Sequence, residues 1–423
     1  MPWLLLLLVG LAAPSAFAQE DERVVEVIDL SGPIDDRIAR FAASSIEAAA
    51  DGGVEVVILQ IDSPGVVRAG EGFDRLMALA ASPPLPLVAW IGPAPAVAYG
   101  GAAQLVAAAP LALAAPGSEI GHWVPTVAGS DDPDPLIPAP AGLFDEAVAV
   151  ESLVGSVFAR VGPETAAPRQ VAQLLDGTAV ATASGPVDVR TIRTLTLEDG
   201  TEGPSVLPTI IREPGLWDAF LRLAATPEAT FFFLVAGLTV AAFEFYAIGP
   251  GIAAGVASVS LVLAGYGLSV LPVRWWAVAV VVAAVAVLAW SYQAGGVLAL
   301  AVLGLVALLV SGFSFTNAAP QIAPGAAGVL LTVAGAAFFF LLAMPTVARS
   351  RFSTQTIGRE GLLGRAGVAR SPIDPDGEVE VDGATWMAHA HREAGLAPGD
   401  PVTVVGVDGW FLEVEPAGRE KSD

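Results

Sequence analysis

The sequence of 423 residues contains no cysteine, only three histidines and a single lysine, Lys421. Without cysteine, the chain can form no disulfide bond, no thiolate nucleophile and no thiolate metal site. A lysine base is restricted to the C-terminal tail, where Lys421 is the third residue from the end. Enzyme classes that need a cysteine or a lysine inside a folded domain are therefore disfavoured.

Charge is also scarce, and it is nearly absent from residues 230–348, which contain only Glu244 and Arg274. A bilayer crossing takes about 20 apolar residues, so this block predicts an integral membrane segment. Glycine, proline and polar breaks divide the predicted bundle at 230–345 into about five spans. We place them near 230–248, 251–271, 275–291, 295–312 and 326–345.

Most of the charge that is present is negative, with a net charge of −23 for the whole chain. An acidic protein lacks the electrostatic attraction that nucleic acid requires, so we expect no nucleic-acid partner. The sequence also suggests no cofactor.

The N-terminus has the pattern of an export signal. Trp3–Ala18 is an apolar run that ends in Ala-Phe-Ala before an acidic stretch, which predicts a signal peptide over 1–18. We therefore expect the following domain to be extracytoplasmic. Arginines after the last span then predict a cytoplasmic C-terminal domain by the positive-inside rule.

Residues 20–213 show alternating strands and helices. Apolar strands are predicted at Val24–Leu30, Val54–Ile61 and Leu85–Ile91, with helices at Asp35–Ala50 and Gly70–Ala81. Continuously apolar strands that alternate with helices indicate a mainly parallel sheet buried on both faces. Further helices are expected over 142–160 and 164–175, and a linker helix is expected over 214–229.

The C-terminal residues 357–416 have a different pattern, with five short strands separated by turns such as Asp382-Gly383 and Asp408-Gly409. Five short strands in so small a region predict an all-β barrel of the OB type.

Five short motifs occur in this order along the chain: Ile61–Gly65 (IDSPG), Ala115–Gly121 (APGSEIG), Ile357–Gly361 (IGREG), Gly377–Gly383 (GEVEVDG) and Val402–Gly409 (VTVVGVDG). Together with the order of the predicted domains, these motifs make the chain resemble the long form of the NfeD family. The resemblance implies a multidomain membrane protein with a ClpP/crotonase-like α/β domain, a transmembrane bundle and an OB-like domain. It also implies a stomatin-like (SPFH) membrane protein as partner or substrate.

The resemblance implies a serine nucleophile at the start of a core helix, a lysine base, and an oxyanion hole formed by a Pro-Gly-Gly turn. The matching stretch here is Pro95–Gly101, where Val97, Tyr99 or Gly100 takes the serine position according to register. No Ser, Thr or Cys lies between Ser82 and Ser118. Gly65 and Gly101 remain as glycines of the oxyanion turns. The expected catalytic serine and base are thus absent.

One alternative keeps catalysis through His122, with Ser63, Ser82, Ser118 or Tyr99 as the nucleophile. The simpler interpretations are that His122 is a loop histidine without a catalytic role, and that the ring of Tyr99 fills the vacated pocket. His389 and His391 share a strand face, but two ligands without a third make a poor metal site. Glu244 is expected near the lipid headgroups, and Asp131, Asp132 and Asp134 are expected in a solvated loop.

The hypothesis favoured by the sequence is a catalytically degenerate scaffold or adaptor that acts with a stomatin/SPFH-type protein in the bilayer. Homo-oligomerisation is left open. The alternative is an active membrane-bound ClpP-class serine endopeptidase with an unrecognised nucleophile. A transporter-like bundle, suggested by a faint repeat of residues 245–252 at 291–298, is a third, weaker hypothesis.

Overall fold

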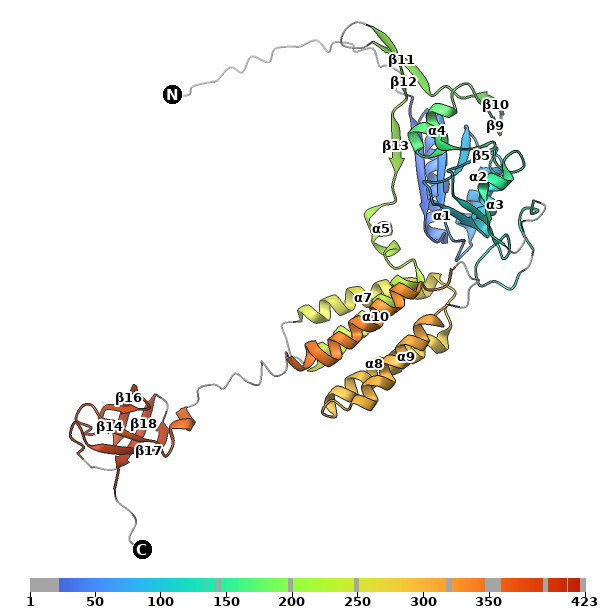
Figure 1. The fold of residues 1–423 in the computed structure, drawn as a ribbon. Helices are drawn as coiled ribbons and strands as arrows, with labels where there is room; N and C mark the ends of the chain where they lie inside the picture. Colours follow the sequence, from blue (N-terminus) through green and yellow to red (C-terminus); the bar gives the residue numbers. More distant parts are fainter. Residues whose placement is uncertain are drawn as a thin grey trace, which may run out of the picture. The chain divides into compact units, whose positions relative to one another are not determined.

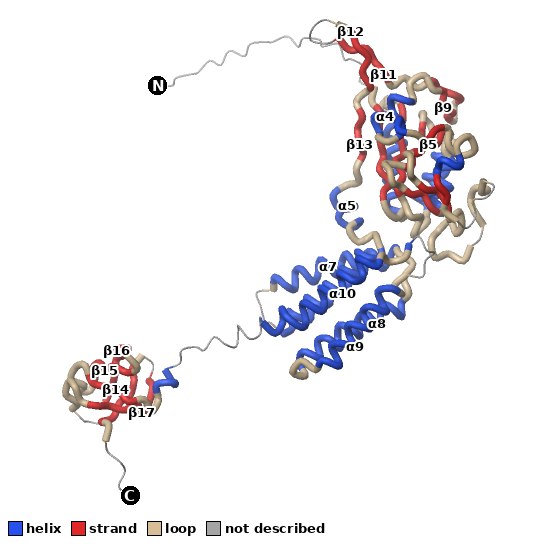
Figure 2. Tube along the Cα trace, viewed as in Figure 1, coloured by secondary structure: helices blue, strands red, loops and turns tan. Residues whose placement is uncertain are grey.

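The chain divides into two compact units, Met1–Met344 and Pro345–Asp423 (Figure 1). A computed structural model describes residues 23–132, 134–140, 143, 146–196, 201–246, 251–316, 322–346, 359–390, 395–408 and 410–418. The predicted signal peptide over 1–18 lies outside these residues. Figure 2 separates the regions rich in strands from the segment built only of helices.

The first unit begins with a six-stranded parallel sheet. Its order is β13 (Thr209–Arg212), β1 (Val25–Ser31), β2 (Val56–Asp62), β3 (Leu87–Ile91), β5 (Leu111–Ala114) and β8 (Arg160–Val161). Helices α1 (Asp36–Asp51), α2 (Glu71–Ala81) and α3 (Gly101–Ala108) connect the central strands. The Asp35 carboxylate caps α1 by accepting from the backbone N–H groups of Arg37 and Ile38.

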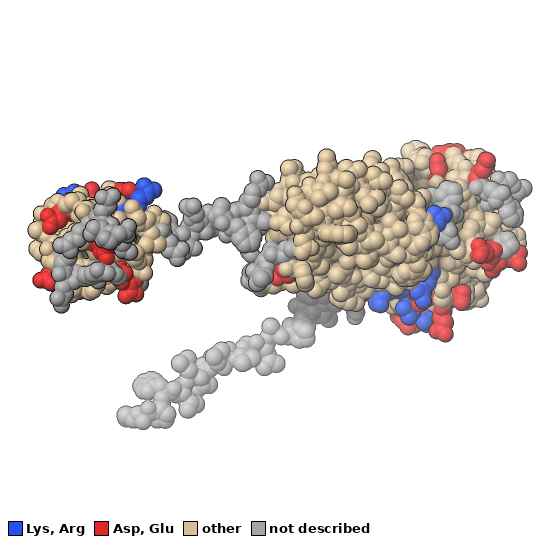
Figure 3. Space-filling view, turned by 90° about the horizontal axis from the view of Figure 1, so that it is seen from below, with Lys and Arg blue, Asp and Glu red and all other residues tan. Residues whose placement is uncertain are grey.

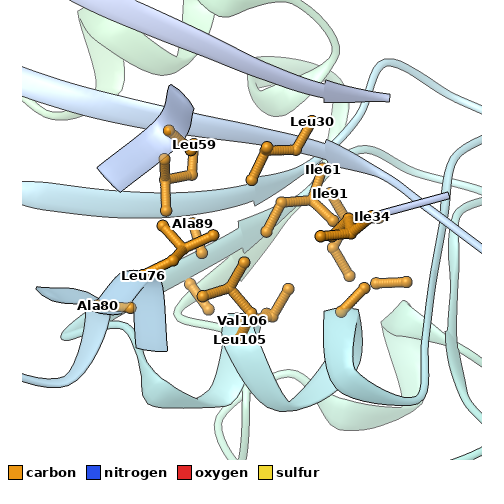
Figure 4. Close-up of a cluster of buried hydrophobic side chains, with 14 of the residues drawn as sticks. Leu30, Ile34, Leu59, Ile61, Leu76, Ala80, Ala89, Ile91, Leu105 and Val106 are labelled. Carbon is orange, nitrogen blue, oxygen red and sulfur yellow. The ribbon is translucent and has the colours of Figure 1, made fainter. Parts of the chain in front are cut away.

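Both faces of this sheet are buried. Successive side chains of a strand point to opposite faces and so belong to different cores. Leu59, Ile61 and Ala89 pack on one face against α1, α2 and α3 (Figure 4). Ile58 and Trp90 pack on the other face, with α4 (Pro168–Leu174) and β9 (Ala179–Thr182). The buried parallel sheet predicted from the apolar strands is present.

A second, three-stranded sheet lies beyond the ends of β2 and β3. It consists of β4 (Val97–Tyr99), β6 (Glu119–Gly121) and β7 (Val148–Ala149). The helix expected over 142–160 is wrong, because β7 pairs with β6 and β8 pairs with β5. Among the described residues of this range, the helical structure is the short 3₁₀ turn η1 (Val150–Leu153), since strands here complete two sheets.

The rest of the α/β region consists of short elements. A 3₁₀ turn, η2 (Pro163–Thr165), precedes α4. Two hairpins follow: β9 pairs with β10 (Gly185–Asp188), and β11 (Ile192–Thr196) pairs with β12 (Glu202–Val206). After β13, the expected linker helix is the shorter α5 (Leu216–Arg222).

The remainder of the first unit is helical. The helices are α6 (Pro227–Tyr246), α7 (Ile252–Val270), α8 (Trp275–Gln293), α9 (Leu298–Phe313) and α10 (Ala326–Phe338), the last continued by a π-helical turn, η4 (Phe339–Ala343). Four of them, α6, α7, α8 and the continued α10, are long and apolar enough to cross a membrane, whereas α9 has 16 residues. Their surface forms a broad area without charged side chains (Figure 3).

In the second unit, a 3₁₀ turn, η5 (Arg359–Leu362), precedes a closed barrel. Its strands are β14 (Ala366–Ala369), β15 (Asp376–Val381), β16 (Ala384–Ala390), β18 (Phe411–Pro416) and β17 (Pro401–Asp408), in spatial order. All pairs are antiparallel except β16 with β18. Val379, Val404 and Val414 belong to its own buried core. The closed five-stranded barrel agrees with the sequence-based prediction.

Candidate active site

A sharp turn joins β4 to α3 at Gly100. Its backbone angles are φ 55° and ψ −126°, which an L side chain rarely adopts. A strand, a strained residue and a helix start in this order resemble the turn that presents a nucleophile in α/β hydrolases. Of the three positions that the sequence left open for the family's serine, Gly100 is the one at this turn.

The backbone N–H groups at this turn are already hydrogen-bonded within the chain. Gly100 N–H donates to the carbonyl oxygens of His122, at 2.9 Å, and Gly121, at 3.2 Å. Gly101 N–H donates to the carbonyl of Thr126 at 2.9 Å. An oxyanion hole needs free donors aimed at the reacting oxygen. Here the donors at the helix start are occupied by carbonyls of the chain itself.

The space beside the turn is filled as well. A Cβ atom added at Gly100 would lie 2.9 Å from the carbonyl oxygen of Pro125. At Gly101, an added Cβ would lie 2.6 Å from the Thr126 carbonyl oxygen and 2.6 Å from Val66 Cγ2. The turn therefore has no room for a serine side chain unless the segment from His122 to Ala128 moves.

That segment, the 122–128 segment, also contacts the turn after β2. Val127 forms a parallel bridge with Val66, and Ala128 N–H donates to the Val66 carbonyl at 2.7 Å. Gly65, in the same turn, has φ 141°, and its N–H lies 3.2 Å from Ser63 Oγ. The 122–128 segment thus runs between the two turns that the sequence analysis singled out, at Gly65 and at Gly100–Gly101.

A buried glutamine on α3, Gln104, holds the 122–128 segment in place. Its side-chain amide donates to the Trp123 carbonyl at 2.8 Å and to Thr126 Oγ1 at 2.9 Å. Its side-chain oxygen accepts from Leu136 N–H at 2.9 Å. Gln104 is fully buried. The sequence analysis missed this residue, although it is the only amide side chain in the charge-free run 76–118.

Three of the four hydroxyl groups considered as nucleophiles form hydrogen bonds with groups other than His122. Ser63 and Ser118 are fully buried; Ser63 Oγ lies near the Gly65 backbone and Ser118 Oγ accepts from Ala96 N–H. Ser82 ends α2 and is exposed. Tyr99 donates to Glu119 Oε2 at 2.7 Å, and its ring packs edge-on against His122 at 5.0 Å between ring centroids. In the described part of the chain, the four hydroxyls and His122 form no Ser-His or Tyr-His hydrogen bond.

The acidity of Tyr99 changes in the wrong direction for a nucleophile. Burial, and then the hydrogen bond to Glu119, raise the pKa of its phenol above the ordinary value. A nucleophilic hydroxyl needs a base or a lowered pKa. Tyr99 therefore stays protonated, and its ring packs against that of His122.

The metal candidates remain dispersed among the residues that the structure describes, where no group of three His, Asp or Glu side chains could hold an ion. His389 Nδ1 lies 2.8 Å from Asp376 Oδ1, and His391 lies outside the described residues. Asp131, Asp132 and Asp134 are exposed in a loop. Glu244 lies in the last turn of α6.

Comparison with known proteins now adds two matches. A family model described as the NfeD integral membrane domain matches residues 228–345, and one described as the NfeD-like C-terminal, partner-binding domain matches residues 359–416. The chain thus contains two NfeD domains. Both matches follow the order predicted from the sequence, and the chain is an integral membrane protein.

Three similar proteins come from Pyrococcus horikoshii. The membrane-bound protease PH1510 is 30% identical over 94 residues, which are 22% of this chain and 21% of that protein. The solved 1510-N membrane protease, specific for a stomatin homolog, is 14% identical and covers 47% of this chain and 96% of its own, with a TM-score of 0.35. The C-terminal domain of stomatin operon partner protein 1510-C is 29% identical and covers 15% and 97%, with a TM-score of 0.14.

The aligned region spans about a fifth of the curated relative's length. The chain has the predicted order of parts: an α/β region, a group of apolar helices and a closed five-stranded barrel.

Proposed function

We propose that this NfeD protein is a non-catalytic membrane scaffold whose α/β domain has lost peptidase activity. The observation that supports this most directly is at the β4–α3 turn, where Gly100 takes the place of a nucleophile. Its N–H and that of Gly101 donate to carbonyls of the 122–128 segment. A peptide substrate would have to displace this segment before it reached either donor.

The side chains give independent support. A serine hydroxyl needs a base to remove its proton, and arginine cannot serve because its pKa exceeds about 12. Between Ser82 and Ser118 the sequence contains no hydroxyl except the Tyr99 phenol, and the only lysine is Lys421. Nucleophile, base and oxyanion donors are thus all altered, and each loss alone lowers activity greatly.

The test uses the full-length protein purified in detergent. It is incubated with a fluorophosphonate serine probe and with a peptide library, and the heat-denatured protein serves as the control. We expect no difference between native and denatured samples in labelling or in cleavage. Native-specific labelling at Ser63, Ser82, Ser118 or Tyr99 would support the alternative of an active serine endopeptidase.

The C-terminal barrel is the partner-binding element in this proposal, and the partner is a stomatin-like membrane protein. The matching family model is described as partner-binding. The barrel has its own closed sheet and buried core, so it can be tested alone. Trp410 is 80% exposed, and exposed tryptophans are frequent anchors of interfaces.

Residues 359–418 are used as bait for a stomatin-like protein expressed in membranes. We expect capture by the natural barrel and by Thr385→Ala, an exposed control on β16, and weaker capture by Trp410→Ala. Equal capture by all three variants would remove Trp410 from the interface. Failure of the natural barrel to enrich the stomatin-like protein would contradict the proposed partnership.

A further inference from the structure

Helix α5 exposes an unusual group of large apolar side chains. Leu216 is 92% exposed, Trp217 is 61% exposed and Leu223, which follows the helix, is 57% exposed. The Trp217 ring stacks on Phe220 at 5.6 Å between centroids. Each exposed Å² of apolar surface costs about 25 cal/mol in water. Covering this apolar group, Leu216, Trp217 and Leu223, with lipid or protein would therefore lower the free energy.

The helix cannot rotate to bury this apolar group against its own domain. Asp218 forms an ion pair with Arg37 Nη1 at 2.9 Å, and the Arg222 guanidinium donates to the Ser31 carbonyl. After the helix, the Ala224 carbonyl accepts from Thr230 Oγ1 at 2.7 Å. Contacts with the sheet on one side and with α6 on the other thus fix the orientation of α5.

The position of α5 along the chain indicates which environment covers this apolar group. Figure 1 shows α5 as the connection between β13 and the helices, and α6 begins at Pro227, five residues after Arg222. Five residues span at most about 18 Å. The matched integral membrane domain begins at residue 228, so α5 lies within reach of the bilayer surface.

We propose that α5 is an interfacial anchor, with Leu216, Trp217 and Leu223 inserted at the boundary between headgroups and acyl chains of the bilayer. The leaflet is the one at the N-terminal end of α6. Tryptophan is enriched at this depth because its ring is apolar and its N–H is polar. A short amphipathic helix with such side chains lies in the plane of the interface. The α/β domain is thereby held at a fixed height on the membrane.

The natural absence of cysteine permits a direct test. Leu216→Cys and Leu223→Cys are each spin-labelled in the full-length protein and reconstituted into phosphatidylcholine vesicles. Val187→Cys on β10, also an exposed apolar position, is the control. Collision rates are measured with oxygen, which concentrates in lipid, and with a polar nickel chelate, which stays in water.

We expect the ratio of oxygen to nickel collisions to be several-fold higher at positions 216 and 223 than at 187. The same ratio at all three positions would overturn the proposal, because α5 would then be in water. Exclusion of both reagents at 216 would also overturn it, since a protein surface and not lipid would then cover the helix. Because these side chains are exposed, the thermal unfolding of the labelled variants should match that of the unlabelled protein.

Discussion

At the residue scale, Gly100 is the centre of the proposed loss of catalysis, because it occupies a strained turn between β4 and α3. The backbone retains the strained angles of φ 55° and ψ −126°. Glycine adopts them at little cost, whereas another residue pays for the strain. The neighbouring Pro125 carbonyl occupies the space that a side chain would take. We therefore expect that a serine placed at this turn would not be sufficient for peptidase activity.

The first prediction is that Gly100→Ser destabilises the protein and yields no peptidase. The positive φ costs about 1–3 kcal/mol, and the contact with the Pro125 carbonyl adds to that loss. Gly117→Ser is a matched control, because Gly117 has φ 76° and open space around an added Cβ. Thermal unfolding should show a larger decrease for Gly100→Ser than for Gly117→Ser. Reaction of the introduced serine with a fluorophosphonate probe would contradict the expectation.

The second prediction concerns the pH dependence of Tyr99. Its folded-state pKa is raised, so the neutral phenol is favoured by the folded protein. This contribution to stability is fully present below the ordinary tyrosine pKa of about 10 and is lost as pH rises through the folded pKa. Denaturant unfolding from pH 9 upward should show a steeper loss for the natural protein than for Tyr99→Phe. Parallel curves for the two proteins would show that folding does not raise the pKa of Tyr99.

At the scale of elements, Gln104 links α3 to the loop from Trp123 to Leu136. Gln104 provides three of the hydrogen bonds that hold this loop over the start of α3. Its burial makes each bond costly to lose, because the freed carbonyl and N–H groups would have no water nearby. Gln104 thus adds side-chain hydrogen bonds to the backbone contacts that hold the segment beside the two glycine turns.

The third prediction is that Gln104→Leu loosens this loop. We expect a loss of about 1–3 kcal/mol in the free energy of unfolding, since buried polar groups are left unpaired. Limited proteolysis should cut the loop over 123–136 faster than in the natural protein. Gln173→Leu, an exposed glutamine on α4, is the matched control and should leave both properties unchanged. An uncut loop in Gln104→Leu would show that other contacts are sufficient.

At the scale of the whole molecule, helix ends indicate how often the chain crosses the bilayer. The Phe315 carbonyl, just after α9, accepts from Arg274 N–H, just before α8, at 2.9 Å. Gly325 N–H, just before α10, donates to Glu228 in the first turn of α6 at 2.6 Å. Helix α9 therefore returns along α8, although its 16 residues extend only about 24 Å. The odd number of passes stays a prediction, because four helices are long enough to span and α9 is shorter.

The fourth prediction is that the α/β domain and the barrel face different aqueous phases. Since the chain has no cysteine, Ser184→Cys in the α/β domain and Thr385→Cys in the barrel each provide one labelling site. A membrane-impermeant maleimide applied to intact cells or spheroplasts should label position 184 and should label 385 only after lysis. Labelling of both positions before lysis would exclude five crossings.

The fold class could be predicted from the sequence because its signals are local. Charge scarcity over 230–348, continuous apolar strands such as Val54–Ile61, and glycine turns between short strands each report the surroundings of their own segment. The predicted helix over 142–160 failed for the opposite reason. Pairing with β5 and β6, which are distant in sequence, outweighed a local helical pattern.

By itself, the sequence determined that a charge-poor segment must lie in a bilayer, that no serine lies between Ser82 and Ser118, and that the single lysine is Lys421. Only the tertiary structure decided which residue sits at the strained turn and what fills the space beside it. The carbonyls of His122 and Thr126 reach Gly100 and Gly101 because the chain returns through a second sheet and is held there by Gln104. Hydrogen bonds between segments that the chain brings together leave no periodic pattern in either segment.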